Sequence, residues 1–534
     1  MTESRRQLSK FAAIFAGGTM ISRVSGLIRE MVIRGLLPGA VCDVYYFAFR
    51  LPNMLRDLVG EGASNAAFIP VLSETLEKDN EEGFRELTSA LMSAMLVLLT
   101  VVTVLGIFLM PFIAGFLNIL APYTGKQPFS EAELNEVIHA SQWMFPYILF
   151  IGLTVFQMGP LFVKRHYATP SWAPALLNVC LILTCWLMRD WFSNPVYALV
   201  LGAWLGGIAQ FVVQNVAMRK YVGVWRPNFH LRHPGIRHAL WLLVPVVLGQ
   251  SAGEVNKFID LTVAFSFGKG VLSALWNSNI IVQLPLSIFG IAISVAVLPA
   301  VSRAASKGLL NEAHETLKQG LSQCFFLVAP AIAALMVCAV PIVRLLFERG
   351  KFTPADTQLT STALFYLAPG LLFFAWVKVS VSGFYAVKNT KTPVIIAFVS
   401  MLANIVLIFA LVRTSLGYRG LPLATTISYG INFVLLFIFL SRRYGLLWDS
   451  AMALSLSRVV LSASVMAVAM YFISKWMTGI FAAGNLLNNL LLAIGPLGAG
   501  GAVYLALCYA MRVPEFQVFA SLTRRAPAMP TAVE

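Results

Sequence analysis

The sequence carries little charge. Asp, Glu, Lys and Arg together make up 12% of its 534 residues, against about 25% in an average soluble domain. Apolar residues make up 58%, the mean hydropathy is +0.77, and no long polar stretch interrupts the chain. This composition excludes a soluble enzyme, a secreted disulfide-rich domain and a disordered regulator. It indicates an integral membrane protein.

Residue patterns typical of metal or catalytic sites are also lacking. The six cysteines are scattered through apolar stretches without metal-ligand spacing, so we expect neither a disulfide framework nor a structural metal. The six histidines fall in or beside predicted loops, which disfavours a histidine proton relay. HExxH, P-loop, GxSxG and Rossmann motifs do not occur in a fitting context. The protein is therefore predicted not to be an enzyme and to need no cofactor.

Long apolar runs divide the chain regularly. A helix needs about 20 apolar residues to cross a bilayer, and we count fourteen such segments, which predict an all-α polytopic membrane protein. The predicted transmembrane helices cover residues 9–36, 43–73, 87–119, 136–163, 168–188, 195–218, 239–267, 271–301, 317–347, 357–387, 392–413, 418–441, 450–474 and 483–511.

The distribution of Lys and Arg predicts the orientation. With the N-terminus in the cytoplasm, the inner loops and tails carry 22 of these residues and the outer loops carry eight. This bias favours a cytoplasmic location for both termini. The formal net charge of +15 is thus explained mostly by the Lys and Arg residues of the predicted cytoplasmic loops and tails. We therefore expect no nucleic-acid partner.

Weak internal repeats predict two related lobes. Residues 50–52 (RLP) and 68–73 (FIPVLS) resemble residues 283–285 (QLP) and 297–302 (VLPAVS) in the same order. The match aligns predicted helices one to six with helices seven to twelve and predicts a pseudo-twofold axis along the membrane normal. We therefore expect an N-lobe at 1–225, a C-lobe at 226–445, and two extra helices with a cytoplasmic tail at 446–534.

Charged residues nevertheless occur inside the first two predicted helices. A charge at a helix centre costs about 2.5–3.5 kcal/mol on the insertion scale, so these side chains should face protein or water. One interpretation is that they snorkel from helix ends or form internal ion pairs. The other is a water-filled cavity with a cationic wall, because arginine keeps its charge and its planar donors fit phosphate oxygens. The residues concerned are Arg23, Arg29, Glu30, Arg34, Asp43, Arg50, Arg56, Asp57 and Glu61.

A second charged cluster lies in the seventh predicted helix. Glu254, Lys257 and Asp260 are spaced three residues apart, which puts neighbouring members within reach of one another. The cluster is either a self-neutralising structural network or a functional group, in which Asp260 holds a coupling cation or Lys257 contacts an anion. Lys378 in the tenth predicted helix either faces a substrate or is paired or snorkelling.

Several motifs along the chain belong together. They are residues 22–30 (SRVSGLIRE), Asp43, 49–56 (FRLPNMLR), 61–63 (EGA), 67–70 (AFIP), 347–353 (FERGKFT), 383–385 (GFY) and 391–393 (KTP). In combination they resemble the MurJ (MviN) lipid II flippase family within the multidrug/oligosaccharidyl-lipid/polysaccharide exporter superfamily. The resemblance runs essentially end to end and fits fourteen helices.

The resemblance implies a function and a set of site residues. Members move lipid II, the undecaprenyl-pyrophosphate-linked peptidoglycan precursor, from the inner to the outer leaflet of the bacterial cytoplasmic membrane by alternating access. The last two helices would form a groove for the polyprenyl tail. Matched substrate positions are Arg23, Arg29, Arg56, Asn53, Asp43, Glu61 and Lys378.

Two departures from the family pattern concern the site. The arginine that many members carry in the eighth helix is absent, because Asn279 and Ile280 occupy its neighbourhood, and Lys257 is our candidate replacement. Asp260 and Asn404 match positions of a sodium site in some members, but Ile408 stands where a carboxylate would follow. Coupling to sodium, to protons or to the membrane potential is left open.

Other functions are compatible with parts of this pattern. An exporter of another polyprenyl-linked oligosaccharide would also need cationic groups. A cation-coupled drug exporter of the same fold would need an anionic cavity, and a membrane scaffold would tolerate buried charges only as closed pairs. Expected partners are lipid II, membrane lipids and the cell-wall synthesis machinery.

Overall fold

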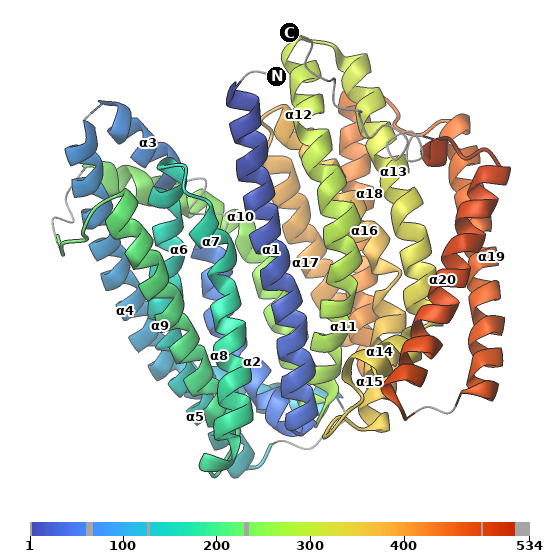
Figure 1. The fold of residues 1–534 in the computed structure, drawn as a ribbon, viewed down its shortest axis with the longest axis horizontal. Helices are drawn as coiled ribbons and strands as arrows, with labels where there is room; N and C mark the ends of the chain where they lie inside the picture. Colours follow the sequence, from blue (N-terminus) through green and yellow to red (C-terminus); the bar gives the residue numbers. More distant parts are fainter. Residues whose placement is uncertain are drawn as a thin grey trace, which may run out of the picture. The chain divides into compact units, whose positions relative to one another are not determined.

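The computed structural model describes residues 3–59, 68–78, 80–124, 129–228, 234–481 and 484–517 (Figure 1). Helices dominate these ranges, and no β-strand occurs within them. Ten helical stretches of the described chain are long and apolar enough to cross a membrane, and one bent pair raises the number to eleven. The prediction of an all-helical, multi-span membrane protein is confirmed.

The chain divides into two compact units, which are described separately. Unit 1 comprises residues 1–273 and 349–353. Its α-helices are α1 (Glu3–Leu36), α2 (Gly39–Val59), α3 (Ile69–Lys78), α4 (Asn80–Leu120), α5 (Glu131–Met144), α6 (Tyr147–Val163), α7 (Ala168–Trp172), α8 (Pro174–Met188), α9 (Val196–Tyr221) and α10 (Pro234–Ser266). The start of α11 (Val271–Pro285) also belongs to this unit.

Unit 2 comprises residues 274–348 and 354–534. Its α-helices after α11 are α12 (Ala292–Ser306), α13 (Leu310–Val337), α14 (Ala339–Phe347), α15 (Pro354–Leu367), α16 (Gly370–Ala386), α17 (Lys391–Val412), α18 (Gly420–Tyr444), α19 (Ser450–Ile480) and α20 (Leu486–Ala510). Helices α19 and α20 pack side by side (Figure 1). The predicted lobe boundary at 225/226 concerns the internal repeat rather than this packing, and it stays a prediction.

Prolines break several helices that the apolar pattern predicts as continuous. Helix α5 ends at Met144 and α6 begins after Pro146, while α15 and α16 meet near Pro369 at an angle of 45°. A π-helical turn, Leu286–Ile291, follows Pro285 between α11 and α12. Proline has no N–H to donate to the preceding turn, and its ring crowds that turn. The sequence shows the prolines, but it does not fix the size of each bend.

Small residues allow α8 and α9 to approach each other closely in unit 1. A Cβ atom added at Gly206 would lie 2.8 Å from the backbone Cα of Leu177, and one added at Gly202 would lie 3.0 Å from the Cα of Leu181. The four-residue spacing of these glycines is the small-xxx-small pattern of closely packed membrane helices. The two helices lie side by side along their length (Figure 1).

One short stretch between α14 and α15 packs with unit 1 although its neighbours in sequence belong to unit 2. We call residues 349–353 the crossing segment. The Lys351 N–H donates to the Gly35 carbonyl at 2.9 Å, and the Arg34 guanidinium lies 4.7 Å from the Phe352 ring centroid. Gly350 has φ +59°, and a Cβ there would lie 2.1 Å from the Gly35 carbonyl oxygen. Only glycine satisfies this position.

Candidate functional site

A buried polar network holds Arg29 in place on α1. Its Nε donates to Glu30 at 3.1 Å, its Nη2 also bonds Glu30, and its Nη1 donates to the Asn178 side-chain oxygen at 2.9 Å. The Tyr46 hydroxyl on α2 donates to the other Glu30 oxygen at 2.5 Å. Glu30 itself is 0% exposed. This carboxylate therefore joins α1 to α2, and Arg29 joins α1 to α8.

Asn178 extends the same network along α1. Its amide nitrogen donates to the Ser22 carbonyl at 3.1 Å and to the Ser25 hydroxyl at 2.8 Å. Arg23, beside this contact, is exposed at the surface of the structure. The Arg29 side chain, by contrast, is only 13% exposed. The two predicted cations on α1 thus differ, since Arg29 is held by side chains from inside the unit and Arg23 lies at its surface.

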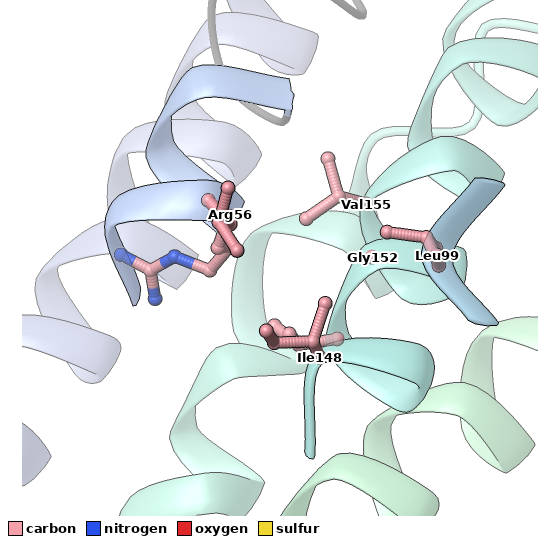
Figure 2. A pocket seen from close by; sticks show the side chains of 7 residues that line it. Arg56, Leu99, Ile148, Gly152 and Val155 are labelled. Carbon is pink, nitrogen blue, oxygen red and sulfur yellow. The ribbon is translucent and has the colours of Figure 1, made fainter. Parts of the chain in front are cut away.

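Arg56 lies near the end of α2 at the edge of a small apolar pocket. Its Nη2 donates to Asp57 at 2.8 Å, and its side chain is 31% exposed. Leu99 and Val155 from α4 and α6 contribute to the pocket. Figure 2 shows the Arg56 guanidinium pointing away from these apolar side chains. Asn53, three residues earlier, is buried.

Asp43, also on α2, caps the beginning of another helix. Its Oδ1 accepts from the backbone N–H of Ser273 at 2.8 Å and from the Ser273 hydroxyl, and its Oδ2 accepts from the Gly270 N–H. These donors lie at the N-terminus of α11, where backbone N–H groups have no partner within the helix. Asp43 is buried, with 4% of the residue exposed. Its contacts in this structure are those of a structural cap.

The second predicted cluster is joined to α2. Glu254 on α10 pairs through Oε2 with Arg50 and through Oε1 with Lys257, whose Nζ is 2.7 Å away. Arg50 and Glu254 are buried, whereas the Lys257 side chain is 54% exposed. Asp260, one turn further along α10, is half-buried.

The remaining predicted residues lie elsewhere. Lys378 on α16 is exposed at the surface of unit 2, and its backbone carbonyl accepts from Ser294 at 2.9 Å. Asn404 on α17 is fully buried, and Ile408 one turn later is buried as well. Glu61 lies outside the described residues. No group of three or more His, Cys, Asp or Glu side chains that could hold a metal ion occurs in the part of the chain that the structure describes.

Comparison with known proteins identifies the family. The sequence model for "Lipid II flippase MurJ" matches residues 36–492. The chain belongs to the MurJ family. A probable lipid II flippase MurJ of Vibrio cholerae is 36% identical over 446 residues, which cover 82% of this chain and 83% of the relative.

Solved structures share the fold of this MurJ family member. A lipid II flippase MurJ in an inward closed conformation aligns with a TM-score of 0.74 at 24% identity, covering 92% of this chain and 98% of that chain. An inward-facing multidrug resistance MATE family transporter of the MOP superfamily aligns with a TM-score of 0.66 at 15% identity, covering 82% of this chain and 98% of that chain. At these identities the likeness concerns the fold.

The arginines of this MurJ family member have close acidic neighbours in the structure. Glu30, Asp57 and Glu254 each bond an arginine of α1 or α2. The adjacent pairs at 29/30 and 56/57 are visible in the sequence, and the role of Asn178 could be suspected from a polar residue within an apolar run. The bond between Arg50 and Glu254 spans 204 positions, and no local pattern indicates it.

Proposed function

We propose that this chain is a lipid II flippase of the bacterial inner membrane, which carries the undecaprenyl-pyrophosphate-linked precursor from the inner to the outer leaflet. It is a transporter and not an enzyme. The observation that carries the proposal is the MurJ family match over residues 36–492. The relative from Vibrio cholerae, named a probable lipid II flippase, supports the same substrate.

Arg23, Arg29 and Arg56 are the proposed contacts for the pyrophosphate. Arginine retains its charge at any physiological pH and presents paired donors to phosphate oxygens. The bonds from Arg29 to Glu30 and Asn178 support this role by fixing the direction of the guanidinium before a ligand arrives. The proposed substrate set also includes five further residues, Asn53, Asp43, Glu61, Lys257 and Lys378. Asp43 is proposed to act through its contacts with the start of α11.

The proposed topology has fourteen transmembrane helices and both termini in the cytoplasm. Helices α1, α2 and α10 carry the intramembrane charges and are not among the eleven apolar candidates in the described chain. Counting these three helices as spans gives fourteen. We propose that residues 1–225 and 226–445 form two six-helix lobes that rock about a cavity at the membrane midplane, with 446–534 as two extra helices and a tail.

The membrane potential is the proposed driving force. It supplies about 2.3 kcal/mol per charge per 100 mV, and with a negative interior it pushes an anionic pyrophosphate outward. The residues around Asn404 fit a sodium ion poorly, because a buried isoleucine, Ile408, stands one turn away where a carboxylate would be needed. We therefore derive no step through sodium. Separate dissipation of the sodium, proton and electrical gradients would tell the three forms of coupling apart.

Partners of the proposed flippase follow from its substrate. The polyprenyl tail stays in lipid, and we propose that α19 and α20 form its groove. The enzymes of cell-wall synthesis that make and consume lipid II are the natural protein partners. Nucleic acid is not among the proposed partners.

The test is a measurement of lipid II exposed on the outer leaflet of cells depleted of their own flippase and supplied with this chain. The wild-type chain should restore exposure, and the Arg29→Ala and Arg56→Ala variants should not, although they reach the membrane in normal amount. Arg443→Ala, at the exposed end of α18, is the matched control and should restore exposure. Failure of the wild-type chain to do so in cells without another flippase would refute the proposal.

A further inference from the structure

One buried carboxylate in unit 1 neutralises two cations. Glu254 on α10 holds Arg50 of α2 through one oxygen and Lys257 of its own helix through the other. The two partners differ in their surroundings. The Arg50 side chain is 8% exposed and that of Glu254 is 9%, whereas that of Lys257 is 54% exposed.

In this triad, Glu254 has two cationic partners, and burial decides which of them it must neutralise. A buried carboxylate without a partner is costly, and so is a buried guanidinium. Arg50 and Glu254 therefore satisfy each other inside the structure. Lys257 is not needed to neutralise this buried pair, and its ammonium group is exposed.

The chemistry of lysine lets this charge serve two acceptors. The ammonium group has three donors on a flexible stem. Its bond of 2.7 Å to Glu254 uses one of them. The three-residue spacing on α10 keeps the two side chains on neighbouring positions of the helix surface. A phosphate oxygen can thus approach Lys257 while Glu254 still restrains the stem.

We propose that Lys257 binds the pyrophosphate of the substrate and that Glu254 is the positioning residue that holds its ammonium group ready. Arg50 is the permanent counter-ion that lets Glu254 do this when Lys257 turns toward the ligand. The inference rests on the proposed function for the identity of the ligand.

The test measures binding rather than flipping. Undecaprenyl pyrophosphate is titrated onto the full chain in lipid nanodiscs, with undecaprenyl monophosphate as a second probe. Lys257→Gln should weaken pyrophosphate binding about tenfold, as expected for the loss of one partly exposed charged hydrogen bond. Its unfolding temperature should not change, because Arg50 and Glu254 remain paired. Lys257→Arg should restore binding, and Lys269→Gln, an exposed lysine outside the triad, should bind like the wild type.

A double-mutant cycle tests the positioning role of Glu254. If Glu254 holds Lys257, adding Lys257→Gln to Glu254→Gln should weaken binding much less than tenfold, since the lysine is already misplaced. A full tenfold additional loss would overturn the positioning role. Unchanged binding in Lys257→Gln alone, or a fall in its unfolding temperature as large as that of Glu254→Gln, would overturn the whole inference. A chain that binds as expected but does not flip lipid II would contradict the proposed function alone.

Discussion

The Oδ1 atom of Asp43 accepts a hydrogen bond from the backbone N–H of Ser273, 230 residues further along the chain, at 2.8 Å. A side chain of α2 therefore completes the first turn of α11. The Ser273 hydroxyl bonds the same oxygen, and the Gly270 N–H bonds the other one. Charged acceptors at a helix N-terminus also interact favourably with the helix dipole. Asp43 thus ties the middle of unit 1 to the point where the chain leaves it.

Removal of this cap should destabilise the protein. Asp43→Ala leaves at least two buried N–H groups without an acceptor, and we expect a loss of about 1–3 kcal/mol. Thermal unfolding in detergent should show a lower midpoint. Asp190→Ala is the matched control, because the Asp190 side chain is 81% exposed. Equal midpoints for the two variants would mean that the cap contributes nothing.

The adjacent tyrosines of α2 provide a matched pair. Tyr46→Phe removes the hydroxyl that donates to buried Glu30 and should cost about 1.5–3 kcal/mol, the range for a hydrogen bond to a charged group. The Tyr45 hydroxyl is buried and has no hydrogen-bond partner among the described residues. Tyr45→Phe should therefore be neutral or slightly stabilising. Unfolding midpoints of both variants check the prediction, and a larger loss in Tyr45→Phe would contradict the network around Glu30.

Two glycines should respond in opposite directions to alanine. Gly206→Ala places a methyl group 2.8 Å from the Leu177 Cα, and overpacking of this kind costs about 1–3 kcal/mol. Gly498 on α20 has no heavy atom within 4 Å of an added Cβ. Gly498→Ala should raise stability by up to about 1 kcal/mol through helix propensity. Thermal unfolding of both variants is the measurement, and destabilisation of both would argue against close α8–α9 packing as the cause.

Asp449 should make stability depend on pH in the acid range. Its bond from Lys318 and its cap on the Met452 N–H lower the pKa of this carboxyl below 3.8. A lowered pKa stabilises the fold fully above 3.8, and the stabilisation is lost as the pH falls through the lowered value. Asn can still cap the helix but cannot pair with Lys318. The unfolding midpoint of Asp449→Asn should therefore lie below that of the wild type at pH 7, and the gap should narrow as the pH falls below 3.8. A gap independent of pH would exclude the ion pair as its source.

The helices were largely predictable because long apolar runs have few other solutions in a membrane. The breaks within these helices were harder to predict. Pro146 and Pro369 are plain in the sequence, yet the 45° bend at the second depends on how α15 and α16 pack against their neighbours. Helices α1, α2 and α10 were identified as spans by length despite their charges, and their crossing of the bilayer stays a prediction.

The charged residues were predictable as a set but not in their pairing. Arg50 is buried and Arg29 and Arg56 are partly buried, so each requires a partner, and an adjacent Glu30 or Asp57 is the simplest candidate for two of them. The partner of Arg50 is Glu254 on α10, and Asp43 bonds backbone groups rather than a cation. Such long-range contacts follow from the fold, which one sequence does not determine residue by residue.

The crossing segment has a consequence for dividing the protein into pieces. Gly350 and Lys351 complete the surroundings of Gly35 at the end of α1, although they are encoded far downstream. Two polypeptides separated after residue 225 or after residue 273 would leave the first fragment without this five-residue patch. Complementation between such fragments should therefore require co-expression, and the N-terminal piece produced by itself should expose the Arg34 side chain that Phe352 covers in the intact chain.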